Sequence, residues 1–349
     1  MLNRIKTRQV NIGKVCIGGE NSIAIQSMTN LSVEKVDETV CQIRSLIDAG
    51  CDIVRIAVPN MTSAKMFAKV RDKVDIPLVA DIHFDYRLAI ASIEAGADKI
   101  RINPGNIAEK NLDNVIDAAK AYNVAIRIGV NGGSVNKGFI YKYRDPAQAL
   151  VESVKHYVNY FETRGFYDLV LSAKSSDIVR TLKINRALSA LHYPMHLGIT
   201  EAGPTEQGIL KNAIGIGSLL ADGIGDTVRV SLTADPVEEV IAAKQILNVL
   251  GIGRSVQFVS CPKCGRCTVD LEGIASAVYD YVKNLDCNLK IAVMGCEVNG
   301  PGECRDADLG LAGANGQFVF FKKGQIYKYV NADSAVREFI DEINLLCKG

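Results

Sequence analysis

The chain has 349 residues, of which 48% are hydrophobic and 23% are charged, as is usual for globular proteins. Its 40 Lys and Arg nearly balance its 39 Asp and Glu, so no overall field attracts nucleic acid or an anionic membrane. Residues 1–15 lack the apolar core of a signal peptide, and no run approaches the roughly 18 apolar residues of a membrane span. We therefore expect a cytoplasmic protein.

From residue 22 onward, short β-branched runs alternate with amphipathic segments of helical length. The first such helix is expected over 36–50, where the final Gly suits a C-cap, and the last starts with Asp235 as N-cap and Pro236 behind it. Eight βα units in about 230 residues favour a (β/α)8 TIM barrel over a doubly wound open sheet. The predicted strands are 22–28, 53–58, 77–83, 99–103, 124–131, 168–174, 194–200 and 227–232.

Polar residues gather at the ends of these strands, where the active sites of such barrels lie. Residues i and i+2 of a strand share a face, so Arg101 with Asn103, for example, can point inward together. Five cations from five strands predict a site for a phosphate or diphosphate, since guanidinium groups match its oxygens. His196 is expected to be an interior histidine with its polar atoms satisfied. The five cations are Arg55, Arg101, Arg127, Lys174 and Arg229, and the other polar candidates are Asp81, His83, Asn103, Asn131, Thr200, Glu201 and Ser231.

After Gly253 the pattern changes to that of a small α+β domain. We predict a barrel domain over 1–252 and a second domain over 253–349, with helices near 270–284 and 333–346. Seven of the ten cysteines lie in the last 89 residues of the chain. In a reducing compartment this density indicates metal binding or redox chemistry, so disulfides are set aside.

The segment "CPKCGRC" (261–267) contains a C-x2-C chelating motif, and "MGCEVNGPGEC" (294–304) supplies further candidate ligands. The spacing suits either a structural zinc or an iron–sulfur cluster. A second C-x2-C knuckle, which most zinc ribbons have, is missing from this part of the sequence. The residues alone leave both metals open.

These motifs, together with "IRINPGNI", "IRIGVN", "GITEAG" and "GIGDTVRVSLTADPVEEV", closely resemble the family of 4-hydroxy-3-methylbut-2-enyl diphosphate synthases. The resemblance runs nearly end to end and is to the two-domain bacterial form. It implies a TIM barrel followed by a small α+β domain that carries a [4Fe–4S] cluster. The matching cluster ligands are Cys261, Cys264, Cys296 and Glu303. Cys267 and Cys304 depart from the family pattern, and we retain Glu303 as the fourth ligand because adjacent residues of an extended loop point apart.

The resemblance also implies the reaction, which is the penultimate step of the methylerythritol phosphate route to isoprenoids. 2-C-methyl-D-erythritol 2,4-cyclodiphosphate undergoes a two-electron reductive ring opening with loss of water to 4-hydroxy-3-methylbut-2-enyl diphosphate. Ferredoxin or flavodoxin is the implied electron donor, and the family pattern places the diphosphate on the five cations and Ser231. Glu201 is the candidate proton donor. The implied assembly is a head-to-tail homodimer in which each cluster domain caps the partner's barrel.

Two other classes of protein are compatible with parts of the pattern. One is a phosphate-binding lyase barrel with a structural zinc domain. The other is a zinc-knuckle protein that binds RNA, against which the near-neutral charge and the absence of tryptophan argue.

Overall fold

A computed structural model describes residues 4–131, 135, 137–253, 255–267, 269–283, 285, 287–296, 305–314 and 317–348. The chain divides into two compact units, the first ending at residue 246 and the second starting at residue 247. This point lies within the last helix of the barrel, α9 (Pro236–Val249). The domain limits 1–252 and 253–349 remain a prediction.

The first unit is a closed barrel of eight parallel strands that follow one another in chain order. An isolated parallel bridge between Leu171 and Met195 joins the two outermost strands of the ladder and closes it. The predicted (β/α)8 barrel is therefore confirmed, and the open sheet is excluded. The strands are β3 (Ala24–Met28), β4 (Ile53–Ala57), β5 (Leu78–Asp81), β6 (Lys99–Ile102), β7 (Ala125–Asn131), β8 (Leu169–Lys174), β9 (His196–Leu197) and β10 (Thr227–Val228).

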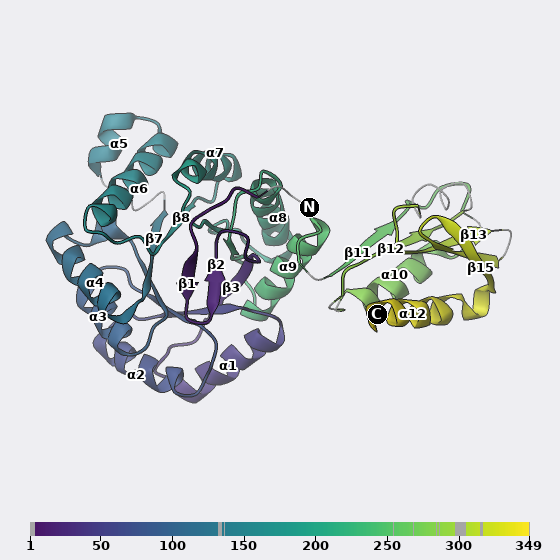
Figure 1. Cartoon of the computed structure of the whole chain (residues 1–349), viewed down its shortest axis with the longest axis horizontal. Coiled ribbons are helices and arrows are strands. Elements are labelled where there is room, and N and C mark those ends of the chain that lie inside the picture. Colours follow the sequence, from purple (N-terminus) through teal and green to yellow (C-terminus); the bar gives the residue numbers. More distant parts are fainter. Residues whose placement is uncertain are drawn as a thin grey trace. The chain divides into compact units, whose positions relative to one another are not determined.

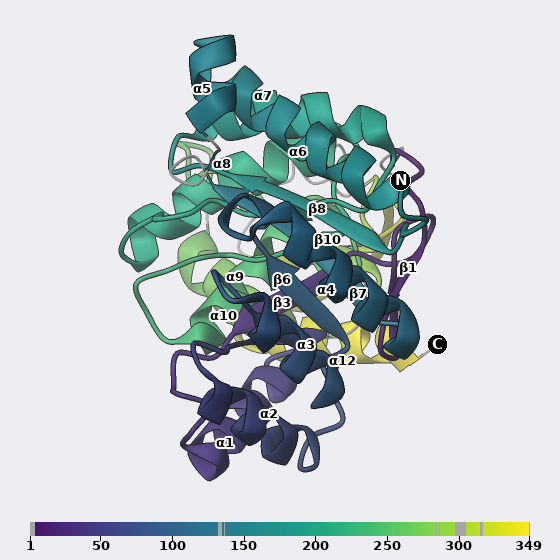
Figure 2. The same ribbon diagram turned by 90° about the vertical axis from the view of Figure 1, so that its left-hand side faces the viewer.

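Helices follow the strands and lie on the outside of the barrel (Figures 1 and 2). Short polar side chains cap several of them: Asp177 accepts the N–H of Arg180 at 2.8 Å, and Asp235 accepts the N–H of Val237 at 2.8 Å, as predicted for α9. The other helices of this unit are α1 (Val36–Asp48), α2 (Met61–Arg71), α3 (Tyr86–Glu94), η1 (Pro104–Asn106), α4 (Glu109–Tyr122), α5 (Lys137–Tyr143), α6 (Pro146–Glu162), α7 (Ile178–Leu188), η3 (Ser189–Leu191) and α8 (Thr205–Ala221).

A short antiparallel hairpin, β1 (Val10–Ile12) and β2 (Val15–Ile17), closes one end of the barrel. Its buried side chains pack against residues at the N-terminal ends of strands, among them Ile53 and Val79. The sequence analysis did not predict this hairpin. With the N-terminal end plugged by apolar contacts, the polar C-terminal mouth is the face where the barrel can bind a ligand.

The second unit contains a five-stranded mixed sheet in the order β11-β12-β13-β14-β15. Helices α10 and α12 share one core with the sheet, where Phe320 meets Phe339 edge to face. The predicted helices near 270–284 and 333–346 are present as α10 and α12, whereas the last three strands were not predicted. The elements are β11 (Val256–Ser260), α10 (Leu271–Val282), β12 (Leu289–Met294), β13 (Leu309–Ala314), β14 (Gln317–Lys322), β15 (Gln325–Asn331) and α12 (Ala332–Lys348).

One disulfide joins Cys287, just before β12, to Cys347 at the end of α12. The two Cα atoms are 5.5 Å apart, although 60 residues separate them along the chain. The expectation that none of the clustered cysteines is disulfide-bonded is therefore wrong for this pair. Their closeness results from packing of α12 against the sheet, which cysteine spacing does not reveal.

Candidate functional site

The mouth of the barrel holds a polar cavity of about 150 Å³ at the C-terminal ends of the strands. All five predicted cations line it. Gly129 and Ser172 line it as well and were not predicted. The complete lining is Arg55, Asp81, His83, Arg101, Arg127, Gly129, Ser172, Lys174, Thr200, Arg229 and Ser231.

Asp81 is the acidic centre of one half of this cavity. Nη1 of Arg101 lies 3.3 Å from Oδ1 of Asp81 and 3.1 Å from Nε2 of His83, which is itself 3.3 Å from Oδ2 of Asp81. Burial opposes a charge on Asp81, but the guanidinium of Arg55 and the contact with His83 outweigh it and hold the pKa of Asp81 well below its usual range. Asp81 is thus ionised and balances one of the surrounding cations.

Arg229 is oriented on the opposite side by a carboxylate from helix α9. Its Nη2 lies 3.1 Å from both oxygens of Glu239, and its Nη1 donates to Oγ of Ser231 at 2.7 Å. Glu239 is buried and also accepts the backbone N–H of Leu232 at 3.0 Å. Glu239 was not predicted, although it stands in the motif "DPVEEV", because it lies on a helix and not at the end of a strand.

Arg127 and Lys174 are the cations with the least internal compensation. Arg127 is 2% exposed, and in the part of the chain that the structure describes its Nε and Nη1 have no hydrogen-bond partner. Burial and the neighbouring guanidinium groups lower the pKa of Arg127, and burial with Arg127 lowers that of Lys174. Buried unpaired cations are costly. An anion in the cavity would supply their missing partners.

Two glycines make room for these long side chains. A Cβ on Gly129 would lie 2.5 Å from Nε of Arg101, and a Cβ on Gly198 would lie 2.5 Å from Nζ of Lys174. Both distances are shorter than any allowed contact. The barrel wall is therefore shaped to hold Arg101 and Lys174 inside the mouth.

Two predicted residues, Asn103 and Glu201, are absent from the lining of the cavity, and a third cannot be placed. Asn103 accepts the N–H of Gly105 at 3.2 Å and so caps η1. Glu201 is exposed and adopts a left-handed backbone with φ of 55°. The side chain of Asn131 lies outside the described residues. The roles of all three remain predictions.

His196 is completely buried, as expected, but both of its ring nitrogens lack a hydrogen-bond partner within the described ranges. The expectation of a satisfied histidine is therefore not met. Burial and the nearby Lys174 lower the pKa of His196 well below its usual value.

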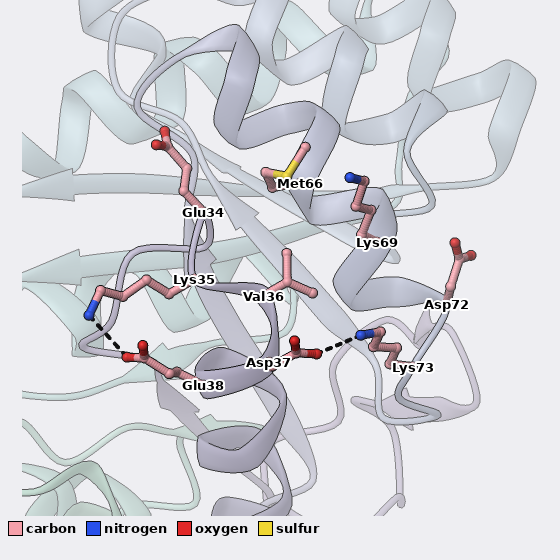
Figure 3. Close-up of a pocket in the computed structure, with 9 residues that line it drawn as sticks. All are labelled: Glu34, Lys35, Val36, Asp37, Glu38, Met66, Lys69, Asp72 and Lys73. Carbon is pink, nitrogen blue, oxygen red and sulfur yellow. Dashed lines mark hydrogen bonds and ion pairs between the residues drawn. The ribbon is translucent and has the colours of Figure 1, made fainter.

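A larger hollow of about 610 Å³ lies outside the barrel, between the start of α1 and helix α2 (Figure 3). Its charges largely pair with one another: Lys73 contacts Asp37 at 2.6 Å, and Lys35 contacts Glu38 at 3.1 Å. These pairs leave no set of like charges converging on one point. The mouth of the barrel is the better ligand site despite its smaller volume.

The second unit places the predicted cluster cysteines after neighbouring parallel strands. Cys261 follows β11 and Cys296 follows β12, and the N–H of Cys261 lies 3.4 Å from the carbonyl of Val293. The N–H of Gly295 donates to Sγ of Cys261 at 3.2 Å. Amide hydrogen bonds of this kind are typical around the sulfurs of iron–sulfur clusters.

Position 295, beside the cysteine loop, has no room for a side chain. A Cβ at this position would lie 2.8 Å from Sγ of Cys267, so glycine lets the backbone lie close to this thiol. Cys264 is exposed in the same loop. Among the residues that the structure describes, no three His, Cys, Asp or Glu are already grouped closely enough to hold a metal. Glu303 and Cys304 lie outside those residues, so the ligand set remains a prediction.

Comparison with protein families covers both units. The family described as "GcpE TIM-barrel domain" matches residues 7–244, and "GcpE protein C-terminal domain" matches residues 257–345. A relative from Caldanaerobacter subterraneus is 50% identical over 98% of both chains. One from Clostridium perfringens is 48% identical over 99% of this chain and 100% of its own. Both relatives are named "4-hydroxy-3-methylbut-2-en-1-yl diphosphate synthase (flavodoxin)".

Two solved structures are similar in fold to about 70% of this chain. Dihydropteroate synthase from Stenotrophomonas maltophilia has a TM-score of 0.51 at 15% identity and covers 70% of this chain and 98% of its own. The enzyme from Xanthomonas albilineans gives 0.50 at 13% identity, covering 70% and 100%. At these identities the likeness shows the fold only. Within the described ranges, no helix is both long and apolar enough to span a bilayer.

Proposed function

Since the chain belongs to the GcpE family, we propose that it converts 2-C-methyl-D-erythritol 2,4-cyclodiphosphate to 4-hydroxy-3-methylbut-2-enyl diphosphate. The reaction is a two-electron reductive ring opening with loss of water. The observation that carries the proposal is the convergence of five cations on one cavity of about 150 Å³. Such a mouth suits a small and strongly anionic ligand.

Four of the five cations form two pairs that differ in how they are prepared to hold the diphosphate. Arg229 and Arg101 are pre-oriented by Glu239 and Asp81, so they lose little conformational freedom when the anion arrives. Arg127, whose Nε and Nη1 have no partner in the described structure, gains hydrogen bonds on binding, and the anion offsets the burial and the repulsion that lower the pKa of Lys174. The diphosphate thereby fixes the ring of the substrate at the open end of the mouth.

We propose a [4Fe–4S] cluster held by Cys261, Cys264, Cys296 and Glu303. A bound cluster of this type would supply electrons one at a time. The relatives are named as flavodoxin enzymes, which supports flavodoxin as the electron donor, with ferredoxin as the other candidate. Glu201, next to the mouth residue Thr200, is the proposed source of the proton that leaves with water.

The proposed cluster ligands and the anion ligands lie in different units of the chain. We propose a homodimer in which the cluster domain of one protomer covers the partner's mouth, as the family resemblance implies. Covering the mouth would exclude bulk water and oxygen during reduction. We also propose that the protein works in the cytoplasm, where flavodoxin can reach it.

The test is anaerobic purification followed by iron, sulfide and zinc analysis and a turnover assay with the cyclic diphosphate and reduced flavodoxin. We expect about four irons and four sulfides per chain and formation of the linear diphosphate. Cys264→Ser should lose iron, whereas Cys267→Ser, the matched control in the same loop, should keep it. Zinc without sulfide and no turnover would instead favour a lyase barrel with a structural zinc domain.

A further inference from the structure

Four buried polar side chains form a layer beneath the mouth, which we call the polar floor: Gln26, Lys99, His196 and Thr227. Lys99 stands two residues before Arg101 on β6, and Thr227 of β10 stands two residues before Arg229, which directly follows that strand. Residues spaced by two share a face of a strand, so these side chains also point into the barrel, one step further from the opening. All four are at most 2% exposed, and none lines the mouth cavity.

The polar floor is poorly satisfied internally. Nζ of Lys99 donates to Oε1 of Gln26 at 3.2 Å. In the described part of the chain, Nε2 of Gln26, both ring nitrogens of His196 and Oγ1 of Thr227 have no partner. A charged amine offers three donors, and Lys99 uses one of them in its hydrogen bond to Gln26. A barrel interior filled only for packing would use apolar side chains at these positions.

The charges around Lys99 are dominated by cations. Burial, followed by the fields of Arg127 and Arg55, holds the pKa of Lys99 well below its usual value. The carboxylate of Asp81 is already shared with Arg101. His196 of β9 is a titratable group of the floor itself. The titratable and charged groups of the mouth above it are Arg55 of β4, Asp81 of β5, His83, Arg101 of β6, Arg127 of β7, Lys174 of β8 and Arg229 directly after β10.

We infer that Lys99 is a positioning residue of the anion site, and that its amine takes up a proton from solvent when a diphosphate binds in the mouth above it. The negative charge of the ligand offsets the repulsion from Arg127 and Arg55, which are the groups that disfavour the ammonium form. Lys99 acts through these arginines and need not touch the ligand. The inference rests on the proposed function in taking the ligand to be a diphosphate.

Thermodynamic linkage makes the effect measurable. If anion binding favours protonation of Lys99, protonation favours anion binding by the same factor. The barrel interior then carries one positive charge fewer when the mouth is empty, and it gains that charge on Lys99 when the anion binds. A purely structural lysine would show no such coupling, because its charge state would be the same with and without ligand.

The experiment is calorimetric titration of the anaerobically purified holoprotein with inorganic diphosphate, at one pH in buffers of different ionisation enthalpy. Lys99→Met is compared with the wild type, and Lys110→Met, which replaces an exposed lysine of α4, is the matched control. We expect Lys99→Met to take up fewer protons, by up to about one per bound anion, and to bind roughly tenfold more weakly. Ionisation of the ligand itself cancels in this difference, because it is common to both proteins.

A second measurement separates positioning from structural support. Without anion, the thermal midpoint of Lys99→Met should lie close to that of the wild type, since loss of the buried amine removes a desolvation cost while Oε1 of Gln26 loses its donor. Lys99→Gln, which keeps a donor toward Gln26, serves if the Met variant does not fold. Equal proton uptake and affinity in wild type and variant would overturn the inference and leave the proposed function intact. A wild type that binds neither inorganic diphosphate nor the cyclic substrate would overturn both.

Discussion

Both carboxylate oxygens of Glu239 lie 3.1 Å from Nη2 of Arg229, so the helix that follows the last strand of the barrel holds one of the five cations in the mouth. The side chain of Glu239 is 5% exposed and that of Arg229 is 19% exposed, which limits screening by water. The same carboxylate accepts the N–H of Leu232. It therefore fixes both the cation and the loop that leads into α9.

Glu239→Gln should lower the free energy of unfolding by about 2 kcal/mol, because the half-buried guanidinium of Arg229 loses its charged partner. The loss should shrink with saturating inorganic diphosphate, since the anion replaces the missing carboxylate. Chemical denaturation with and without diphosphate measures both quantities. Glu238→Gln, at the exposed neighbouring position, is the matched control. A loss that diphosphate leaves unchanged would mean that Glu239 only supports the loop.

The strands and their inward-facing cations were predictable, because alternation along a strand is a local property. Arg55, Arg127 and Lys174 reach the cavity for this reason. Glu239 was not predictable in this way, since it comes from a helix that folds back on the mouth. Asn103 has the right spacing, yet its side chain caps the turn that follows it.

Features that leave no periodic pattern in the sequence, or that depend on contacts distant along the chain, were missed. The hairpin β1–β2 has strands of three residues each, too short to show a period. The pairing of Cys287 with Cys347 depends on where α12 packs. The i, i+2 spacing predicts that the residues of the polar floor point into the barrel. Their lack of hydrogen-bond partners becomes visible only in the closed barrel of eight strands.

Gly198→Ala should weaken binding of inorganic diphosphate by at least roughly tenfold, because the added Cβ would lie 2.5 Å from Nζ of Lys174 and 2.4 Å from the carbonyl oxygen of Arg229. The carbonyl belongs to the backbone and cannot rotate away, so the variant should also lose about 1–3 kcal/mol of stability. Gly217→Ala is the control, since a Cβ there meets nothing within 4 Å. It should keep its affinity and gain up to about 1 kcal/mol as a helical alanine. Normal affinity in Gly198→Ala would show that Lys174 is not held by this wall.

The stability of the empty protein should fall as the pH drops through about 6.5, the ordinary value for histidine. Burial, followed by Lys174, Arg127, Lys99 and Arg55, depresses the pKa of His196 in the folded state. Below the unfolded pKa the unfolded chain therefore binds a proton that the folded chain does not, which costs up to about 1.4 kcal/mol per pH unit.

Denaturation of His196→Gln between pH 7.5 and 5.5 (roughly one unit on either side of that value) should show a shallower slope than the wild type. The control is His192→Asn, because His192 is exposed and Asn tolerates its left-handed backbone with φ of 55°. Identical slopes for wild type and His196→Gln would mean that the pKa of His196 is the same in the folded and unfolded states.

Glu201→Gln should leave the affinity for the cyclic diphosphate nearly unchanged while turnover falls by about 10²–10⁴-fold. The side chain is exposed beside the mouth and is absent from the lining that holds the anion, so removing its proton should affect the reaction and not the binding. Gln has the same shape as Glu, so the substitution should not change the strain of the left-handed backbone at this position. Steady-state kinetics with reduced flavodoxin, together with calorimetry of substrate binding, separate the two effects. Glu206→Gln, an exposed carboxylate in the first turn of α8, is the matched control, and wild-type turnover in Glu201→Gln would remove Glu201 from the mechanism.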